Sequence, residues 1–305
     1  MSAIEDLIDR RRLRRKLSFW RVAAIVIVAI AIAAGAYALS ADRMATSKDQ
    51  IARVSIEGMI LEDQKLLDLL DRLKDEDAVK AVVLRIDSPG GTTVGGESIY
   101  EAVRAIAEVK PVAAEVGTLA ASAGYMIASG ADHIVARRTS IVGSIGVIFQ
   151  YVDASQLLET VGVEVNAIKS APLKAEPSPF APAPEAAKEM INRLVMDTYE
   201  WFVALVAERR DMSMAEAKAL ADGSIFSGQQ GLKNRLVDAL GGENEVRRWF
   251  EEDRGIAKDL VIVDREPKDD GFDFSMFAGA RAAIYGVFGL DPRSGSLTTA
   301  VLRKA

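Results

Sequence analysis

Apolar runs alternate with amphipathic stretches along most of the chain. Residues 52–58 (ARVSIEG) and 79–87 (VKAVVLRID) are rich in apolar and β-branched side chains and predict strands, while residues 61–76 between them carry apolar side chains at helical spacing. Residues 94–109 predict a second helix, and residues 111–117 (PVAAEVG) predict a further buried strand. Strands that alternate with helices in this way predict an α/β fold built from βαβ units.

The alternation continues further along the chain. We expect a helix to begin near Ser122, followed by strands at residues 133–136 (HIVA) and 140–149 (SIVGSIGVIF). Residues 170–187 are rich in proline and alanine, which excludes regular helix before Pro184 and predicts a functional loop or a linker. Further helices are predicted at residues 185–209, 214–221 and 274–290.

The N-terminal region contains a long uncharged segment, from Val22 to Ala41. Twenty helical residues at about 1.5 Å each span roughly 30 Å, the thickness of a bilayer core, so this segment predicts a transmembrane anchor. A buried soluble helix and a cleavable signal peptide are the alternatives, the latter because Ala36 and Ala38 form an A-x-A pattern. The apolar run is longer than the core of a typical signal peptide, which favours an uncleaved anchor.

The net charge of −6 is distributed unevenly. Residues 1–21 carry seven basic and three acidic side chains, a balance of +4, which leaves −10 on the remainder. The acidic remainder argues against nucleic acid as a partner of the folded part. By the positive-inside rule the basic segment stays in the cytoplasm, so everything after Ala41 lies on the other side of the membrane.

The chain has no cysteine and one histidine, His133. Disulfides, thiolate metal sites and a cysteine nucleophile are therefore excluded, as is a metal site built from several histidines of one chain. We expect no cofactor and no metal. His133 lies in a short apolar strand with no motif around it, which predicts a structural role.

Two short motifs are candidates for chemistry. Ser122 precedes a helix in AASAGY, where its hydroxyl is either a helix cap or a nucleophile at the helix N-terminus. The SPGG turn, Ser88–Gly91, joins a strand to a helix, and its glycines allow backbone N–H groups to face a ligand, as an oxyanion hole requires. An ordinary turn is the alternative, and the absence of a P-loop lysine argues against nucleotide binding.

Lys169 and Lys174 lie in a largely apolar stretch, IKSAPLKAEP. A lysine acts as a general base only when it is neutral, and burial favours that form because desolvation penalises the charge. On this stretch alone, two solvated lysines on a loop are the alternative to a general base.

Five strings occur in a fixed order: RIDSPGG, AASAGYMIASGADHIVA, TSIVGSIGV, IKSAPLKAEP and FSGQQGLKNRLVDALGG. Together they resemble the signal peptide peptidase family of serine-lysine proteases, in its short membrane-anchored bacterial form, over roughly residues 52–250. The resemblance implies the crotonase or Clp-protease type of α/β spiral, built from ββα units. It also implies an endopeptidase that degrades cleaved signal peptides, in homo-oligomers whose active sites lie at subunit interfaces.

The resemblance also implies site residues. Matched by motif, Ser122 is the nucleophile, Lys174 the general base and Ser144 a residue that orients the lysine. The oxyanion donors are backbone N–H groups near Gly91 and at Ala123. In this mechanism Lys174 takes the proton of Ser122, which attacks the peptide carbonyl.

Two positions depart from the family pattern. Ala123 stands where glycine is more frequent; a main-chain donor tolerates alanine there, although the methyl group narrows the adjoining pocket. Asp87 stands where asparagine is usual, and the sequence offers no account of this change.

The predicted organisation is a basic cytoplasmic segment (1–21), a transmembrane anchor (22–41), a connector (42–51), a protease domain (52–254) and a C-terminal extension (255–305). We expect a single-pass protein of the bacterial inner membrane, with a periplasmic catalytic domain and with signal peptides and other short apolar peptides as substrates. The alternatives are a catalytically inactive peptide-binding membrane scaffold and a crotonase-type acyl-CoA enzyme. The latter needs poised carboxylates and a basic grip on CoA phosphates, for which the chain shows no clear candidate.

Overall fold

The computed structural model describes residues 20–23, 25–27, 29–30 and 48–267. Residues 49–267 belong to one compact unit, which contains the sheet and its helices, and the N-terminal helical residues belong to another. Most of the predicted anchor at 22–41 and all of the predicted helix at 274–290 lie outside the described residues. Among the described residues, no helix is both long and apolar enough to cross a membrane, so the anchor stays a prediction.

A mostly parallel sheet forms the centre of the larger unit. Among the described residues it has eight strands, in the order β6-β5-β3-β2-β1-β8, with β4 beside β3 and β7 beside β4. Only the pair of β5 and β6 is antiparallel among the pairs described. The strands are β1 (Gln50–Ile60), β2 (Val79–Gly91), β3 (Val112–Ala121), β4 (His133–Ala136), β5 (Ile141–Gly143), β6 (Ile225–Ser227), β7 (Ala239–Leu240) and β8 (Val261–Asp264).

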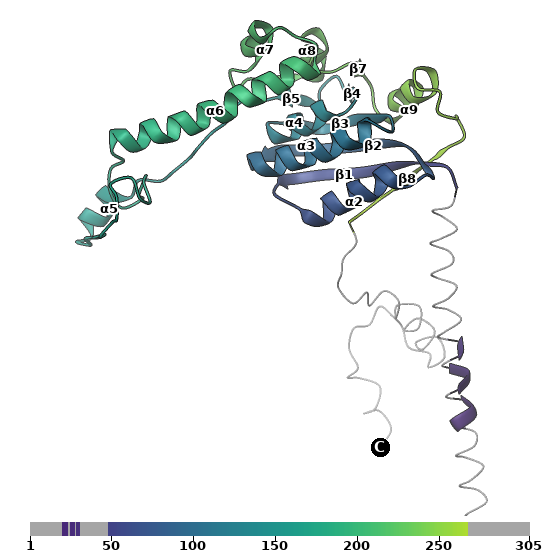
Figure 1. Ribbon diagram of the computed structural model, residues 1–305, viewed down its shortest axis with the longest axis horizontal. Helices are drawn as coiled ribbons and strands as arrows, with labels where there is room; N and C mark the ends of the chain where they lie inside the picture. The colour runs from purple at the N-terminus through teal and green to yellow at the C-terminus, as the bar shows by residue number, and fades with distance from the viewer. Residues whose placement is uncertain (1–19, 24, 28, 31–47, 268–305) are drawn as a thin grey trace, which may run out of the picture. The chain divides into compact units, whose positions relative to one another are not determined.

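Helices cover both faces of this sheet (Figure 1). On one face α2, α3, α4 and the end of α6 enclose the larger core cluster, whereas α9 encloses a smaller cluster around Phe250 on the other. Consecutive residues of β2, such as Val83 and Leu84, belong to different clusters, as expected for a strand that is buried on both faces. The helices are α2 (Gln64–Asp75), α3 (Thr93–Ala107), α4 (Ala123–Gly130), α5 (Ser155–Thr160), α6 (Glu185–Arg209), α7 (Met214–Leu220), α8 (Gly228–Lys233) and α9 (Glu243–Glu252).

The predicted α/β alternation is confirmed, and so is the type of most predicted elements. The helix predicted at residues 185–209 is α6, with the same bounds. Local capping explains where the first helices begin: the Asp63 side chain accepts hydrogen bonds from two backbone N–H groups of α2, and the Thr92 hydroxyl accepts one in α3.

One predicted strand is too long. Of residues 140–149 only Ile141–Gly143 is strand, because Gly143 and Ser144 both have positive φ angles, 98° and 50°, which turn the backbone out of the extended conformation. The Ser144 N–H instead donates a hydrogen bond to the carbonyl of Ser224, at 2.8 Å.

The sheet continues beyond residue 254, the predicted end of the protease domain. Strand β8 pairs in parallel with β1, from Gln50 opposite Val261 to Arg53 opposite Asp264, and therefore belongs to the sheet. Its signal in the sequence is weak because the strand has only four residues and follows an irregular stretch.

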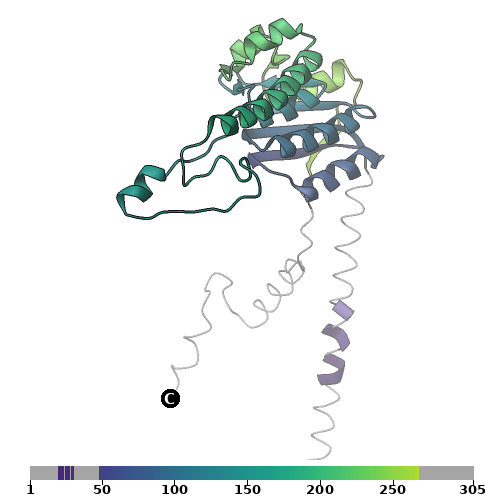
Figure 2. The same cartoon turned by 60° about the vertical axis from the view of Figure 1, so that its left-hand side comes forward.

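Between β5 and α6 the chain leaves the sheet and returns, and we call residues 146–184 the arm. The arm contains α5, and it extends away from the sheet in both views (Figures 1 and 2). A hydrogen bond from the Ala154 N–H to the Pro179 carbonyl, 2.8 Å, joins its outgoing and returning halves. Many large apolar side chains of the arm are exposed, among them Ile148, Phe149, Val152, Leu157, Ile168 and Phe180.

Asp87 supplies hydrogen bonds at an irregularity in the sheet. The register between β2 and β3 shifts between Ile86 and Ser88, and the Asp87 carboxylate accepts hydrogen bonds from the N–H groups of Thr118 and Leu119, each 3.2 Å long. An asparagine at this position has a single acceptor oxygen, whereas the carboxylate offers one oxygen to each amide. This arrangement accounts for the aspartate that the sequence alone leaves unexplained.

Replacing Asp87 by alanine is expected to lower the free energy of unfolding by about 1–3 kcal/mol, because two backbone amides of β3 lose their acceptors. Asp87→Asn keeps one acceptor and is expected to lose less. Denaturant titration of the full-length protein measures both, and equal losses for the two variants would contradict this role of the second carboxylate oxygen.

Candidate active site

Ser122 occupies the sharp turn between β3 and α4. Its backbone angles, φ 53° and ψ −121°, are unusual for a residue with a side chain and are a form of local strain that clusters at functional sites. The Ser122 N–H donates to the carbonyl of Gly143, at 2.9 Å, which fixes the turn against β5. Its side chain makes no capping hydrogen bond with α4, so the interpretation as a helix cap is wrong.

The SPGG turn lies directly against this serine. Gly90 is buried with φ +110°, and a Cβ atom at this position would lie 2.7 Å from the Cβ of Ser122 and 3.2 Å from its Oγ. Only glycine allows so close an approach with this backbone conformation. The neighbouring Gly91 is exposed, and a Cβ atom there would lie 1.8 Å from the carbonyl oxygen of Ile60, so this glycine is required for packing on β1.

Ser88 holds this turn, a role that the sequence analysis missed. Its side chain is fully buried; the hydroxyl donates to the carbonyl of Gly58 at 2.6 Å and accepts from the N–H of Gly90 at 3.1 Å. The only signal available in the sequence is the position of Ser88 within the SPGG motif. The motif does not show which of its two glycines contacts the serine of another segment.

Ala123 is the first residue of α4, and its N–H lies in the first helical turn, where backbone donors have no partner within the helix. Its methyl group packs against α3, since a Cβ atom at Gly96 would lie 2.9 Å from the Cβ of Ala123. Glycine at position 96 thus provides the space for alanine at position 123. The structure therefore explains how the departure from glycine is accommodated.

Ser144 lies beside Ser122 at the ends of two parallel strands. Ala121 of β3 pairs with Gly143 of β5, so each serine directly follows a paired residue. Both serines have positive φ angles, and both are half-buried. The fold thus brings together Ser122, Ser144, Ala123 and the glycine turn, all from segments that surround the end of β3.

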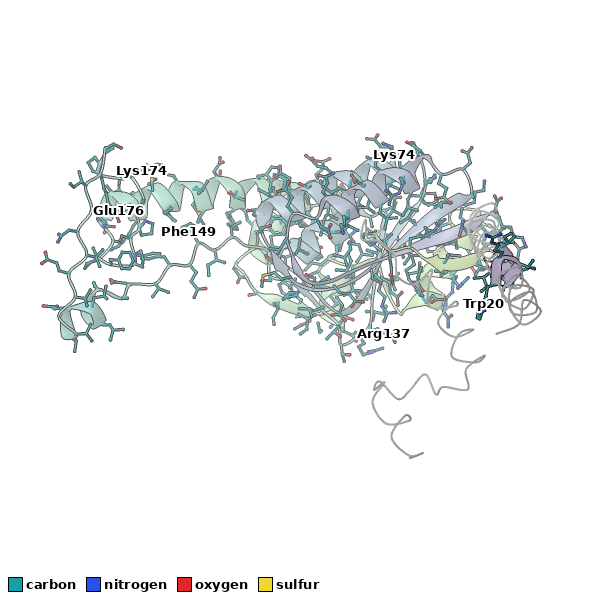
Figure 3. The ribbon with its side chains drawn as sticks, turned by 90° about the horizontal axis from the view of Figure 1, so that it is seen from below. Trp20, Lys74, Arg137, Phe149, Lys174 and Glu176 are labelled. Carbon is teal, nitrogen blue, oxygen red and sulfur yellow. The ribbon has the colours of Figure 1, made fainter. Side chains whose placement is uncertain are left out.

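Lys174 lies elsewhere in the chain. It occupies a turn of the arm, its side chain is exposed, and its N–H donates to the carbonyl of Ala171 at 3.1 Å. Figure 3 shows Lys174 and Glu176 near the outer part of the arm, away from the sheet. Within one chain the structure does not bring Lys174 to Ser122.

His133 is remote from Ser122. It pairs with Ala113 near the start of β3, whereas Ser122 follows Ala121, and eight residues of extended strand span roughly 26 Å. The imidazole stacks on Trp249, with ring centroids 4.8 Å apart, and its burial lowers the pKa of His133 although Asp238 opposes this shift. The only histidine therefore has a packing role, and no group of side chains among the described residues could hold a metal ion.

A strained serine beside a glycine turn, at the N-terminus of a helix, is the kind of site that a serine hydrolase needs: a hydroxyl that is not fully buried and nearby backbone donors for an oxyanion. The family model named Peptidase family S49 matches residues 104–257, about half of the chain. The chain therefore belongs to peptidase family S49 and is a serine protease.

Known protein sequences agree with this assignment. The chain is 37% identical over 227 residues to "Putative protease slr0021" of Synechocystis sp., covering 73% of this chain and 82% of that protein. It is 31% identical over 255 residues to "Putative signal peptide peptidase SppA" of Enterococcus faecium, covering 79% of this chain and 74% of that protein. Among solved structures, a mutant of the 1510-N membrane-bound stomatin-specific protease is 17% identical, with a TM-score of 0.48 over 73% of this chain and all of that one.

The contact between Gly90 and Ser122 predicts a sensitive position. Gly90→Ala forces a methyl group against the serine and is expected to lower peptidase activity about 100-fold, because small displacements of a nucleophile have large effects on rate. Gly255→Ala is the matched control: its φ is +66°, and a Cβ atom there meets nothing within 4 Å.

Both substitutions strain the backbone by about 1–2 kcal/mol, but only the first reaches the serine. Peptide hydrolysis by the two full-length variants, together with their unfolding temperatures, measures the difference. Similar loss of activity in both variants would show that backbone strain alone, and not the contact with Ser122, explains the effect.

Proposed function

We propose that this protein is a membrane-anchored serine endopeptidase that degrades cleaved signal peptides with a Ser122–Lys174 dyad, in which two neighbouring subunits supply the two side chains. The proposal rests on the observation that the two residues lie apart within one chain. Ser122 lies in a strained turn at the end of β3, whereas Lys174 is exposed on the arm. The motif order and the membership of family S49 support the same roles.

In the proposed mechanism the neutral amine of Lys174 takes the proton of the Ser122 hydroxyl as Oγ attacks the peptide carbonyl. The N–H groups of Gly91 and Ala123 stabilise the oxyanion, and the hydroxyl of Ser144 orients the amine. Lys174 then gives the proton to the leaving amine, which leaves an acyl-enzyme ester on Ser122. Water, deprotonated by Lys174, hydrolyses the ester and restores both side chains.

Apolar exposure on the arm supports assembly into homo-oligomers. Ile148 is 82% exposed, Val152 69% and Phe180 51%, and Leu194 in the first half of α6 is 57% exposed. Many large apolar side chains exposed on one segment are typical of a surface that binds another protein. A neighbouring subunit that covers the arm would also desolvate Lys174 and favour its neutral form, which a general base requires.

The proposed location follows from the N-terminal sequence. The uncharged segment at 22–41, after seven basic residues, is consistent with a single-pass anchor whose N-terminus is cytoplasmic and whose catalytic domain is periplasmic. Substrates would be short, apolar, extended peptides, above all signal peptides that leave the bilayer near the tethered site.

We also propose that the repeated strand and helix order from β1 to α4 belongs to a crotonase or Clp-protease type of spiral.

The dyad is tested by single substitutions in the full-length protein. With a fluorogenic peptide of apolar, signal-like sequence, Ser122→Ala and Lys174→Ala are each expected to lower kcat/KM by at least about 10³-fold, since both groups act in one step. His133→Ala is the control and is expected to retain most of the activity. A wild type inactive on a panel of such peptides, or a Ser122→Ala variant as active as wild type, would leave a peptide-binding scaffold as the better explanation.

Sharing of the dyad between subunits makes a separate prediction. When Ser122→Ala and Lys174→Ala chains are coexpressed, random neighbours place an intact serine beside an intact lysine in about a quarter of the sites, so activity is expected to return to that level. The control is a chain that carries both substitutions and is expressed alone. If the mixed protein stays as inactive as its parents, both groups of a site come from one chain.

A further inference from the structure

The loop that contains Lys174 is closed by an ion pair between its two ends. Lys169 Nζ lies in direct hydrogen-bond contact with Glu176 Oε1, and the second carboxylate oxygen of Glu176 accepts the N–H of Ser178 at 2.9 Å. The Glu176 side chain is only 9% exposed and that of Lys169 25% exposed. An ion pair that is partly shielded from water is held more firmly than a fully exposed pair of long side chains.

The pair separates the roles of the two lysines in this stretch. Lys169 is bound to a carboxylate, whereas Lys174 has no ionic partner within 4 Å among the described residues and is exposed. The hydrogen bond from Lys169 is also the main reason why the pKa of Glu176 is lowered, so the carboxylate stays charged and bound to Lys169. Of the two lysines, Lys174 alone is free to meet a group outside its own loop.

The backbone of the loop needs such a fixed closure. Ala175, directly after Lys174, has φ +60°, a conformation that costs an alanine about 1–2 kcal/mol. The internal hydrogen bonds are few: Lys174 N–H to the Ala171 carbonyl at 3.1 Å and Glu176 N–H to the Leu173 carbonyl at 3.3 Å. Without the contact between its ends, the loop would relax, and the position of the Lys174 amine would be lost.

We propose that Lys169 and Glu176 are positioning residues, which together fix the loop 169–176 so that Lys174 is presented to the nucleophile of a neighbouring subunit. This inference rests on the proposed dyad. Because the Glu176 carboxylate is bound to Lys169, it forms no ion pair with Lys174, and a free carboxylate there would hold the amine in its charged, unreactive form. Figure 3 shows Lys174 and Glu176 side by side at the outer part of the arm.

The test uses the full-length protein and the rate at which a fluorophosphonate modifies Ser122. In this reaction an O–P bond forms at Oγ, fluoride leaves and the base takes the proton, so the rate reports the base without any need for a peptide to bind. Lys169→Met and Glu176→Gln are each expected to slow the modification and peptide hydrolysis roughly 10- to 100-fold. Lys169→Arg, which keeps the pair, is expected to react nearly as fast as wild type.

The exchanged double variant, Lys169→Glu with Glu176→Lys, restores the ion pair in reverse but not the acceptor for the Ser178 N–H, so it is expected to recover part of the rate. Lys74→Met is the matched control, because Lys74 also forms an ion pair, with Asp71 at 2.7 Å, but on the distant helix α2. It is expected to react like wild type. Unfolding temperatures that match wild type show that the slow variants are folded.

Two kinds of failure are distinguishable. If wild type reacts and Lys174→Ala does not, while Lys169→Met and Glu176→Gln react as fast as wild type or the exchanged variant reacts no faster than Lys169→Met, the positioning role is overturned and the dyad stands. If wild-type Ser122 is not modified, or Lys174→Ala reacts like wild type, the proposed dyad itself fails and the positioning role fails with it.

Discussion

The close approach of Gly90 to Ser122 is the constraint on which the rest of the site depends. The carboxyl end of β2 and the start of α4 come so near to one another that a single methyl group at position 90 would lie 2.7 Å from the serine Cβ. Both segments are held from behind: the turn by the buried hydroxyl of Ser88, and the serine by its N–H bond to Gly143. The strain in the serine backbone persists because these neighbours fix it, as is usual where strain serves chemistry.

Close packing also explains why several residues around the serine are small. Glycine at position 96 makes room for the methyl group of Ala123, and Gly117 lies where a Cβ atom would be 2.9 Å from the Asp87 carboxylate. Asp87 in turn bonds β3 across the irregular register that brings Ser88 opposite Ala120. The sheet is therefore distorted next to the site, and a polar side chain replaces the ladder hydrogen bonds lost there.

How far the sequence predicts this structure differs from one residue to the next. The alternation of β2, α3 and β3 follows from periodicity, because one repeating pattern is enough to define each element. The end of β5 and the choice between Gly90 and Gly91 do not, since they depend on φ angles and on contacts between segments about 30 residues apart. The role of Lys174 is harder to predict, because within one chain the lysine does not contact the serine. Only the resemblance of the motifs indicates that the two residues act together.

In the proposed mechanism the nucleophile and the base lie on different parts of one chain, which would link catalysis to assembly. In a single subunit Ser122 lies beside backbone donors but no lysine, and the Lys174 side chain is exposed on the arm. Association would bring the two groups together and at the same time cover the apolar arm, so the surface that drives assembly also removes water from the lysine. Under the proposed mechanism, a subunit separated from its neighbours would be inert, and peptide cleavage would be restricted to the assembled protein.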